Sequence, residues 1–140
     1  MATEQPASAG SVSRIECTAR IGGRGEAKVA LFRHLAPITV NAILRGTPFD
    51  SRVNVQPAMV CMFTDIRVGV EKPKSQLARG DVAFLPSGSL LCVFLQSVRS
   101  DRPLNPVGKV ESGIELFEAV RPGDTVRLMG PKEPAAQVPL

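Results

Sequence analysis

The chain has 140 residues, enough for one domain with a hydrophobic core of its own. Its 12 glycines and 12 prolines are many for this length and favour a fold of short strands joined by turns. The net charge of +4 comes from 17 basic residues that are scattered rather than clustered, and the chain lacks Tyr and Trp. Nucleic-acid binding therefore has little support.

Three cysteines, Cys17, Cys61 and Cys92, are too far apart for a paired zinc motif and odd in number. Each lies in an apolar segment, so we expect free thiols that pack as small hydrophobic groups in a reducing compartment. The N-terminus has neither the basic start nor the apolar run of a signal peptide, and no apolar stretch approaches the ~20 residues that span a bilayer. We expect a soluble cytoplasmic protein without a metal or another cofactor.

The two ends of the chain differ in composition from the middle. Residues 1–12 are poor in apolar side chains, and residues 130–140 carry three prolines. Both predict tails without a packed core, a disordered one at the N-terminus and a Pro-rich one at the C-terminus. The folded domain is then expected at residues 13–129.

The first predicted elements are a hairpin and a helix. Residues 13–21 and 26–32 read as strands joined by the turn GGRG, which has neither the spacing nor the Lys-Ser/Thr of a phosphate-binding loop. In HLAPITVNAILRG, Pro37 suits the first helical turn and Gly46 the C′ position. Val40, Ile43 and Leu44 fall on one face, which predicts a helix of about ten residues on the sheet.

The rest of the chain reads mainly as strands, at 52–55, 58–68, 81–85, 90–96, 107–110 and 125–129, with a short helix at 113–119 before the turn RPGD. Eight strands with one main helix and one short helix predict a mainly β fold, a closed or nearly closed barrel. Residues 97–106 read as a long crossover connection, with a lid as the alternative.

Two of these strands are apolar on both faces. LLCVFL at 90–95 and AMVCMF at 58–63 show no alternation of polar and apolar side chains. A strand at the surface of a barrel normally alternates, because only one of its faces meets the core. The pattern predicts an external apolar patch that something covers.

Three segments, in order, resemble the cyclophilins. LFRHLAPITVNAI resembles the end of their second strand and their first helix, SGSLLCVFL a later strand, and VGKVESGIELFEAV a strand followed by a helix. The turn GDVAFLPSG and the VGKV strand are most similar to small prokaryotic cyclophilin-like domains of unknown function. The resemblance implies a closed eight-stranded barrel capped by two helices, with a peptide-binding groove on the outside of its wall.

The residues of the prolyl isomerases in that family are mostly absent. Arg52 falls near the place of their essential arginine. Their groove phenylalanine corresponds to Cys92 and the preceding glutamine to Leu90, while their tryptophan and histidine fall near Arg99 and Leu104. The resemblance therefore argues against an enzyme, with Arg52 as the one catalytic candidate.

Other chemistry has less support. His34 is the only histidine, stands just before the helix and has no neighbouring nucleophile, so an exposed turn residue is expected. Asp81 and Asp124 each follow a glycine before a strand, where we expect them to accept backbone hydrogen bonds. Neither pattern predicts a catalytic site or a metal cluster.

Three hypotheses of function remain. The preferred one is a non-catalytic binding module, whose groove, floored by Met59, Cys61, Leu90 and Cys92 and edged by Arg52, takes an apolar or proline-containing peptide or a small molecule. The alternative is a weak peptidyl-prolyl cis-trans isomerase that uses Arg52. The third is that the same face is buried in a homodimer.

Overall fold

The structure is a computed structural model and describes residues 14–131. The predicted tails, 1–12 and 130–140, lie outside the described residues, apart from Gly130 and Pro131. The elements are β1 (Arg14–Ile21), β2 (Gly25–Phe32), α2 (Pro37–Gly46), β3 (Phe49–Val55), β4 (Met59–Phe63), β5 (Lys74–Leu77), β6 (Asp81–Leu85), β7 (Leu90–Phe94), β8 (Val98–Ser112), α3 (Ile114–Glu118) and β9 (Thr125–Met129).

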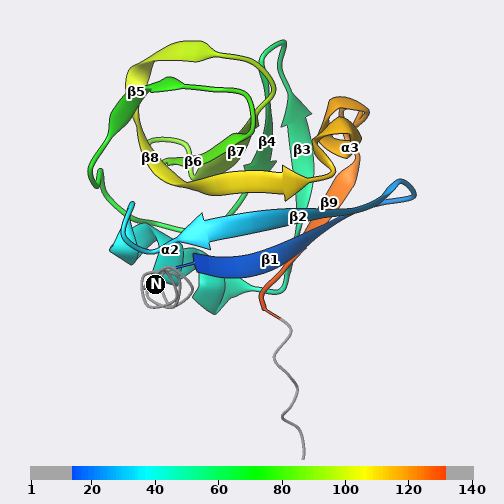
Figure 1. Ribbon diagram of the computed structural model, residues 1–140, viewed down its shortest axis with the longest axis horizontal. Coiled ribbons are helices and arrows are strands. Elements are labelled where there is room, and N and C mark those ends of the chain that lie inside the picture. Colours follow the sequence, from blue (N-terminus) through cyan, green and yellow to red (C-terminus); the bar gives the residue numbers. More distant parts are fainter. Residues whose placement is uncertain (1–13, 132–140) are drawn as a thin grey trace, which may run out of the picture.

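Eight of these strands close a barrel, as predicted. The order is β2-β1-β9-β3-β4-β7-β6-β8, and pairing of β8 with β2 completes the ring. Every pair is antiparallel, and β5 is an additional strand on the outer part of β8. The helices α2 and α3 lie on opposite sides of the barrel (Figure 1). Closure leaves the eight strands without a free edge between them.

The hairpin and the main helix agree with the sequence prediction, except at the C-terminus of the helix. Val40 and Ile43 are fully buried, and Leu44 packs against the same core. Gly46 is the last helical residue rather than the C′ residue. The helix is capped by Thr47, whose backbone is extended and whose amide and hydroxyl both donate to the Leu44 carbonyl oxygen, at 3.2 and 2.7 Å. Thr47 therefore supplies hydrogen bonds to a carbonyl at the end of the helix, a role that a glycine in the left-handed conformation usually has.

Strand β4 is shorter than predicted. It ends at Phe63 instead of residue 68. The Thr64 hydroxyl donates to the Ser89 carbonyl oxygen at 2.8 Å and accepts the Ile66 amide at 3.1 Å. Such a local turn by a hydroxyl side chain ends the ladder, although the sequence beyond it is still partly apolar.

Strand β8 is the largest departure from the prediction. Residues 97–106, expected as a crossover connection or lid, lie almost entirely within a strand of 15 residues. Its first half pairs with β5, which the sequence did not predict, and its second half with β6 and β2. Pro103 and Pro106 suggested a loop, but the ladder shifts register beside Pro106, and prolines are tolerated in such irregular stretches.

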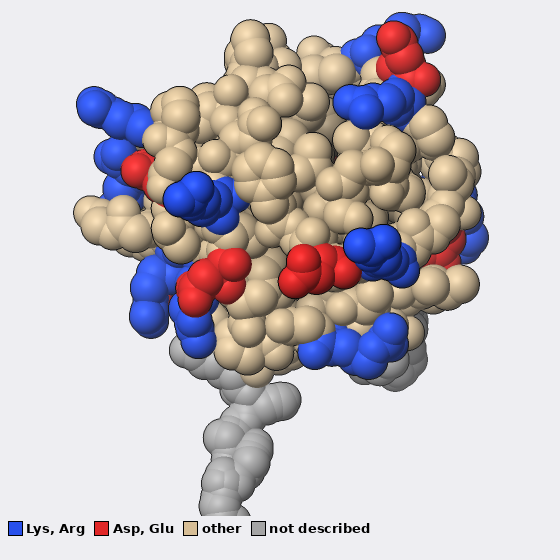
Figure 2. Space-filling model, turned by 180° about the vertical axis from the view of Figure 1, so that it is seen from behind, with Lys and Arg blue, Asp and Glu red and all other residues tan. Residues whose placement is uncertain are grey.

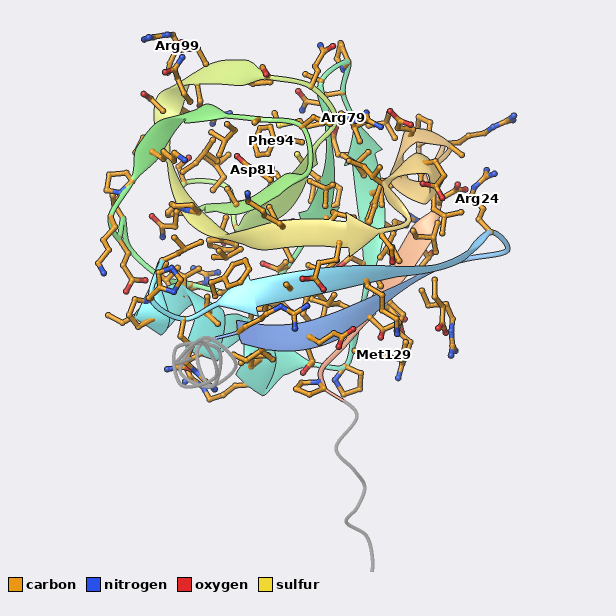
Figure 3. The ribbon with its side chains drawn as sticks, in the orientation of Figure 1. Arg24, Arg79, Asp81, Phe94, Arg99 and Met129 are labelled. Carbon is orange, nitrogen blue, oxygen red and sulfur yellow. The ribbon has the colours of Figure 1, made fainter. Side chains whose placement is uncertain are left out.

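The doubly apolar strands lie between two cores. The barrel interior holds one face of β4 and β7, including Val60, Met62, Leu91 and Val93. The opposite face contributes to a second cluster outside the barrel wall, consisting of Cys61, Leu77, Ala83, Leu85, Cys92, Phe94 and Leu104. Figure 3 shows Phe94 inside the ring that β5 and the first half of β8 form over β6 and β7. The chain's own strands therefore cover much of the predicted apolar patch.

The surface carries mixed charge. On the face in Figure 2, Lys and Arg side chains lie among Asp and Glu side chains. As predicted, Asp81 accepts the Ala78 amide at 2.8 Å and Asp124 the Arg121 amide at 3.0 Å, while His34 is exposed. No helix within residues 14–131 is long and apolar enough to cross a membrane.

Candidate functional site

The predicted groove residues lie around two different cavities. Met59, Cys61, Leu90 and Cys92 line a cavity of about 80 Å³ between the outer face of β4 and β7 and the first half of β8. Arg52, expected at the edge of the same groove, lines a separate cleft of about 550 Å³. The sequence assigned all five to one site because it could not show that β8 folds over the sheet. Their role in binding stays a prediction.

The smaller cavity contains a pair of cysteines. The Sγ atoms of Cys61 and Cys92 are 3.1 Å apart, and the two residues face each other across the β4–β7 ladder. Both side chains are buried, with 1% exposure, and both are free thiols, as is Cys17 in the barrel interior. The sequence predicted buried free thiols but missed this pairing, because strand register depends on contacts between distant segments.

The environment distinguishes the three thiols. Contact with the Cys92 thiol lowers the pKa of Cys61 despite burial, since a neighbouring S–H stabilises a thiolate, and the charge of Arg102 acts in the same direction. The same contact and burial raise the pKa of Cys92. Burial raises the pKa of Cys17 to about 12. Of the three, Cys61 has the greatest thiolate character.

The larger cleft lies where the end of α2 and strand β3 meet the segment after β4. It is lined by Gly46, Phe49, Asp50, Ser51, Arg52, Phe63, Thr64, Asp65 and Ile66. Phe63 is 50% exposed there, although most large apolar side chains of the domain are buried. Sequence reasoning did not select Phe63. Its signal was weak: it is the last residue of β4 on the face that carries Met59 and Cys61.

Two charges in this cleft lack an ion-pair partner within residues 14–131. Five arginines in this range pair with carboxylates, and Arg127 pairs with the cleft residue Asp50 at 2.9 Å. Arg52 and Asp65, both exposed, take part in none of these pairs. The cleft therefore offers a guanidinium and a carboxylate beside an exposed aromatic ring.

A polar network anchors the segment that follows the cleft wall. The Glu71 carboxylate accepts the amides of Ile38 and Thr39, each at 2.9 Å, and so caps the N-terminus of α2, where Ala36 has no capping side chain. The Asn105 side chain accepts the Glu71 amide at 2.7 Å and donates to the Thr39 hydroxyl at 3.0 Å. The Asn105 side chain also donates to the Gly69 carbonyl oxygen at 2.9 Å, so residues 69–71 are tied to both α2 and β8.

Hydrogen bonding also determines the charge state of Glu71. Burial opposes its ionisation, but the amides of Ile38 and Thr39, the Thr39 hydroxyl and the charge of Lys72 outweigh this effect and lower its pKa. The carboxylate is therefore the favoured form at neutral pH, and it matches the positive end of the helix dipole.

The remaining isomerase positions are distributed over β8. Arg99 is exposed at the rim of the domain (Figure 3), whereas Leu104 is buried in the second apolar cluster. No group of three His, Cys, Asp or Glu side chains suited to a metal ion occurs among the described residues.

The barrel, its two helices and the cleft beside β3 define a cyclophilin-like barrel domain. The family model described as Cyclophilin-like matches residues 14–129, so the chain belongs to the cyclophilin-like family. This confirms the resemblance predicted from the three sequence segments.

Solved structures share the fold. The solution structure of the hypothetical protein AF2241 from Archaeoglobus fulgidus is similar with a TM-score of 0.70 and 24% identity, over 84% of this chain and 95% of that one. The structure of McbB in complex with tryptophan is similar with a TM-score of 0.60 and 18% identity, over 87% of this chain but only 46% of McbB. No curated protein matches the chain. At these identities the likeness shows the fold alone.

Proposed function

We propose that this domain is a non-catalytic binding module whose cleft beside β3 takes a small ligand or a peptide end that joins an apolar group to a carboxylate. The observation that carries the proposal is the half-exposed Phe63 beside Arg52 on the wall of the same cleft. An exposed aromatic ring loses unfavourable contact with water when an apolar group covers it. A guanidinium beside it can hold a carboxylate through two parallel hydrogen bonds.

The size and polarity of the cleft support this choice. Its volume of about 550 Å³ lies in the range of ~300–1,000 Å³ that is typical of small-molecule sites. Phe49, Phe63 and Ile66 supply apolar walls, and Arg52 supplies a positive charge without an ion pair in the described part of the chain. Asp65 could bind a ligand ammonium group. A free amino acid with an apolar side chain would therefore contact the apolar walls, Arg52 and Asp65 together.

Tryptophan is a suitable first probe. It combines an aromatic ring, a carboxylate and an ammonium group, and it is the molecule in the McbB complex. Titration of the ¹⁵N-labelled protein with L-tryptophan should shift amide signals of residues 49–52 and 63–66. Tryptamine, which lacks the carboxylate, should bind about tenfold more weakly if Arg52 holds that group.

Two variants test the role of Arg52. Arg52→Ala should reduce tryptophan affinity about tenfold and leave the fold unchanged, because the side chain is exposed. Arg99→Ala, which removes an exposed arginine from β8, is the matched control and should bind as the wild type does. Equal affinities for the two variants, or shifts confined to another face, would overturn the proposal.

A weak peptidyl-prolyl isomerase is the second candidate. It is favoured by the exposed guanidinium of Arg52 at the edge of an apolar surface, which could polarise an X-Pro amide whose rotation barrier is about 18–20 kcal/mol. Exchange spectroscopy on an X-Pro peptide would then show cis/trans exchange peaks that disappear with Arg52→Ala. A peptide that broadens without such peaks is bound but not isomerised.

A homodimer through the outer apolar face is the remaining alternative. The half-exposed Phe63 is the apolar side chain that a second copy could cover, because Cys61 and Cys92 are already buried within the chain. Sedimentation over a dilution series measures this directly. A monomer at all concentrations would exclude a stable dimer, whereas a dimer that dissociates with Phe63→Ala would replace the open cleft with an interface.

A further inference from the structure

The Cys61–Cys92 pair has the placement of a disulfide precursor. Its Sγ atoms are 3.1 Å apart, whereas a disulfide bond measures about 2.0 Å. A shift of about 1 Å shared by two side chains therefore brings the sulfurs to bonding distance. Both residues lie in the middle of their strands, where the flanking pairs keep the register fixed.

The hydrogen-bond pattern of the ladder identifies the type of pair. The Leu95 amide donates to the Ala58 carbonyl oxygen at 2.8 Å, and the Thr64 amide donates to that of Ser89 at 3.1 Å. Hydrogen-bonded and non-hydrogen-bonded pairs alternate along an antiparallel ladder, so Cys61 and Cys92 form a non-hydrogen-bonded pair. The Cα atoms of such pairs are about 4.5 Å apart, within the range of ~4.4–6.8 Å found for disulfides.

A small reagent has a route to the sulfurs. Cys61 and Cys92 line the cavity of about 80 Å³, which exceeds the ~30 Å³ that one water molecule occupies in the liquid. The exposed residues Gln56 and Arg102 line the same cavity, so it reaches the surface. Cys17 differs, since it lies in the barrel interior and lines none of these cavities.

We propose that Cys61 and Cys92 are a site of reversible oxidation, at which hydrogen peroxide converts the two thiols into an intramolecular disulfide. The Cys61 thiolate attacks one peroxide oxygen, the O–O bond breaks, and the leaving hydroxide takes up a proton to become water. The Cys92 sulfur then attacks the resulting sulfenic sulfur, the S–O bond breaks, and a second water leaves with the thiol proton. The dithiol loses two electrons and the peroxide gains two.

Cys61 acts first because its thiol has the lower pKa of the pair, and only the thiolate is a strong nucleophile. Cys92 is the resolving residue because no other thiol within residues 14–131 shares the cavity. A dithiol reductant reverses the reaction by thiol–disulfide exchange, in which its two thiols are oxidised as the protein thiols are restored. The site lies beneath β8 and does not depend on the binding proposal for the cleft.

Intact-mass spectrometry of the full chain tests the proposal. One equivalent of hydrogen peroxide under native conditions should remove about 2 Da, with the loss reversed by dithiothreitol. Peptide mapping without reduction should find Cys61 linked to Cys92 and leave Cys17 open to alkylation after unfolding. A mass gain by Cys17, or only disulfides between chains, would overturn the proposal.

Matched variants separate the roles of the two sulfurs. Cys92→Ala should stop at a sulfenic acid on Cys61, a gain of about 16 Da that dimedone traps. Cys61→Ala should consume peroxide at least tenfold more slowly, whereas Cys17→Ala should form the disulfide as the wild type does. Similar rates for Cys61→Ala and the wild type would refute the assignment. If a variant does not fold, the linkage found in the wild-type chain decides the question alone.

Discussion

Gly108 is the position at which a single methyl group should do most damage to the barrel. It lies in β8, opposite Leu31 of β2 and Val82 of β6, where pairing of β8 with β2 closes the ring. A Cβ atom added there would lie 1.9 Å from the Ala30 carbonyl oxygen and 2.9 Å from the Ala30 carbonyl carbon. Both are backbone atoms, so no side-chain rotation relieves the contact.

The cost follows from the movement required. Ordinary van der Waals contact begins at 3.4 Å, so the two strands must separate locally by roughly 1.5 Å. That separation breaks about two ladder hydrogen bonds, at about 1 kcal/mol each, and adds about 1–3 kcal/mol of strain in a packed core. We expect Gly108→Ala to lower the free energy of unfolding by about 3–5 kcal/mol, a large part of the 5–15 kcal/mol typical of a domain.

Urea unfolding followed by far-ultraviolet circular dichroism measures this loss. Gly69→Ala is the matched control, because its Cβ would meet no atom within 4 Å, and it should lie within about 0.5 kcal/mol of the wild type. A Gly108→Ala protein that unfolds within 1 kcal/mol of the wild type would refute the close approach of β8 to β2. If Gly108→Ala does not fold while Gly69→Ala folds normally, the loss of unfolding free energy exceeds the expected range.

Three further predictions concern the rest of the domain. Glu71→Gln should lower the midpoint of urea unfolding at pH 7, and the difference from the wild type should shrink as the pH falls below 4.5. The reason is that the lowered pKa of Glu71 stabilises the folded state only while the carboxylate is ionised. An equal difference at pH 7 and pH 3 would contradict this. Phe94→Ala should lower the free energy of unfolding by about 3–5 kcal/mol, because Phe94 is fully buried, and Phe63→Ala should lower it by less than about 1 kcal/mol. Equal losses in the two variants would show that the second cluster is not a core. Arg14→Gln removes a surface ion pair with Glu111 and should change the free energy of unfolding by less than about 1 kcal/mol. A larger loss would show that this pair stabilises the fold more than surface ion pairs usually do.

The sequence predicted best those elements that local chemistry specifies. Pro37 and the apolar positions Val40 and Ile43 are enough to fix a helix, and its start and its length of ten residues agree with the expectation, although Gly46 is its last residue rather than the C′ residue. The GGRG hairpin and the turns before β6 and β9 follow from glycine and aspartate in the same way. Each of these patterns involves only a few neighbouring residues, so it can be interpreted without knowledge of the tertiary structure.

The errors come from long-range pairing. Strand β5 reads as polar, and the first half of β8 contains charges and Pro103, so neither has the alternation of a strand. They become strands because each supplies the other's hydrogen bonds and because Leu77 and Leu104 bury apolar area on the outer face of the barrel. The pairing of β5 with β8 also separates the cavity from Arg52, and another long-range pairing, that of β4 with β7, places Cys61 against Cys92.

The outer face of β4 and β7 is one continuous surface with two environments. Phe63 faces Leu90 across the ladder, and the cysteine pair lies one position further along the same face. The first half of β8 covers the cysteines, while Phe63 remains half-exposed beside Arg52. In the two proposals made above, oxidation modifies the covered part of this face and a ligand binds the open part.

This division makes the two proposals separable. Arg52→Ala should reduce tryptophan affinity about tenfold and leave formation of the Cys61–Cys92 disulfide unchanged, because Arg52 lines only the open cleft. Cys92→Ala should stop disulfide formation and leave the tryptophan shifts in place. Mass spectrometry and NMR on the same two proteins measure both quantities. Loss of both properties in either variant would show that the outer face acts as a single site, and the division argued from the position of β8 would be wrong.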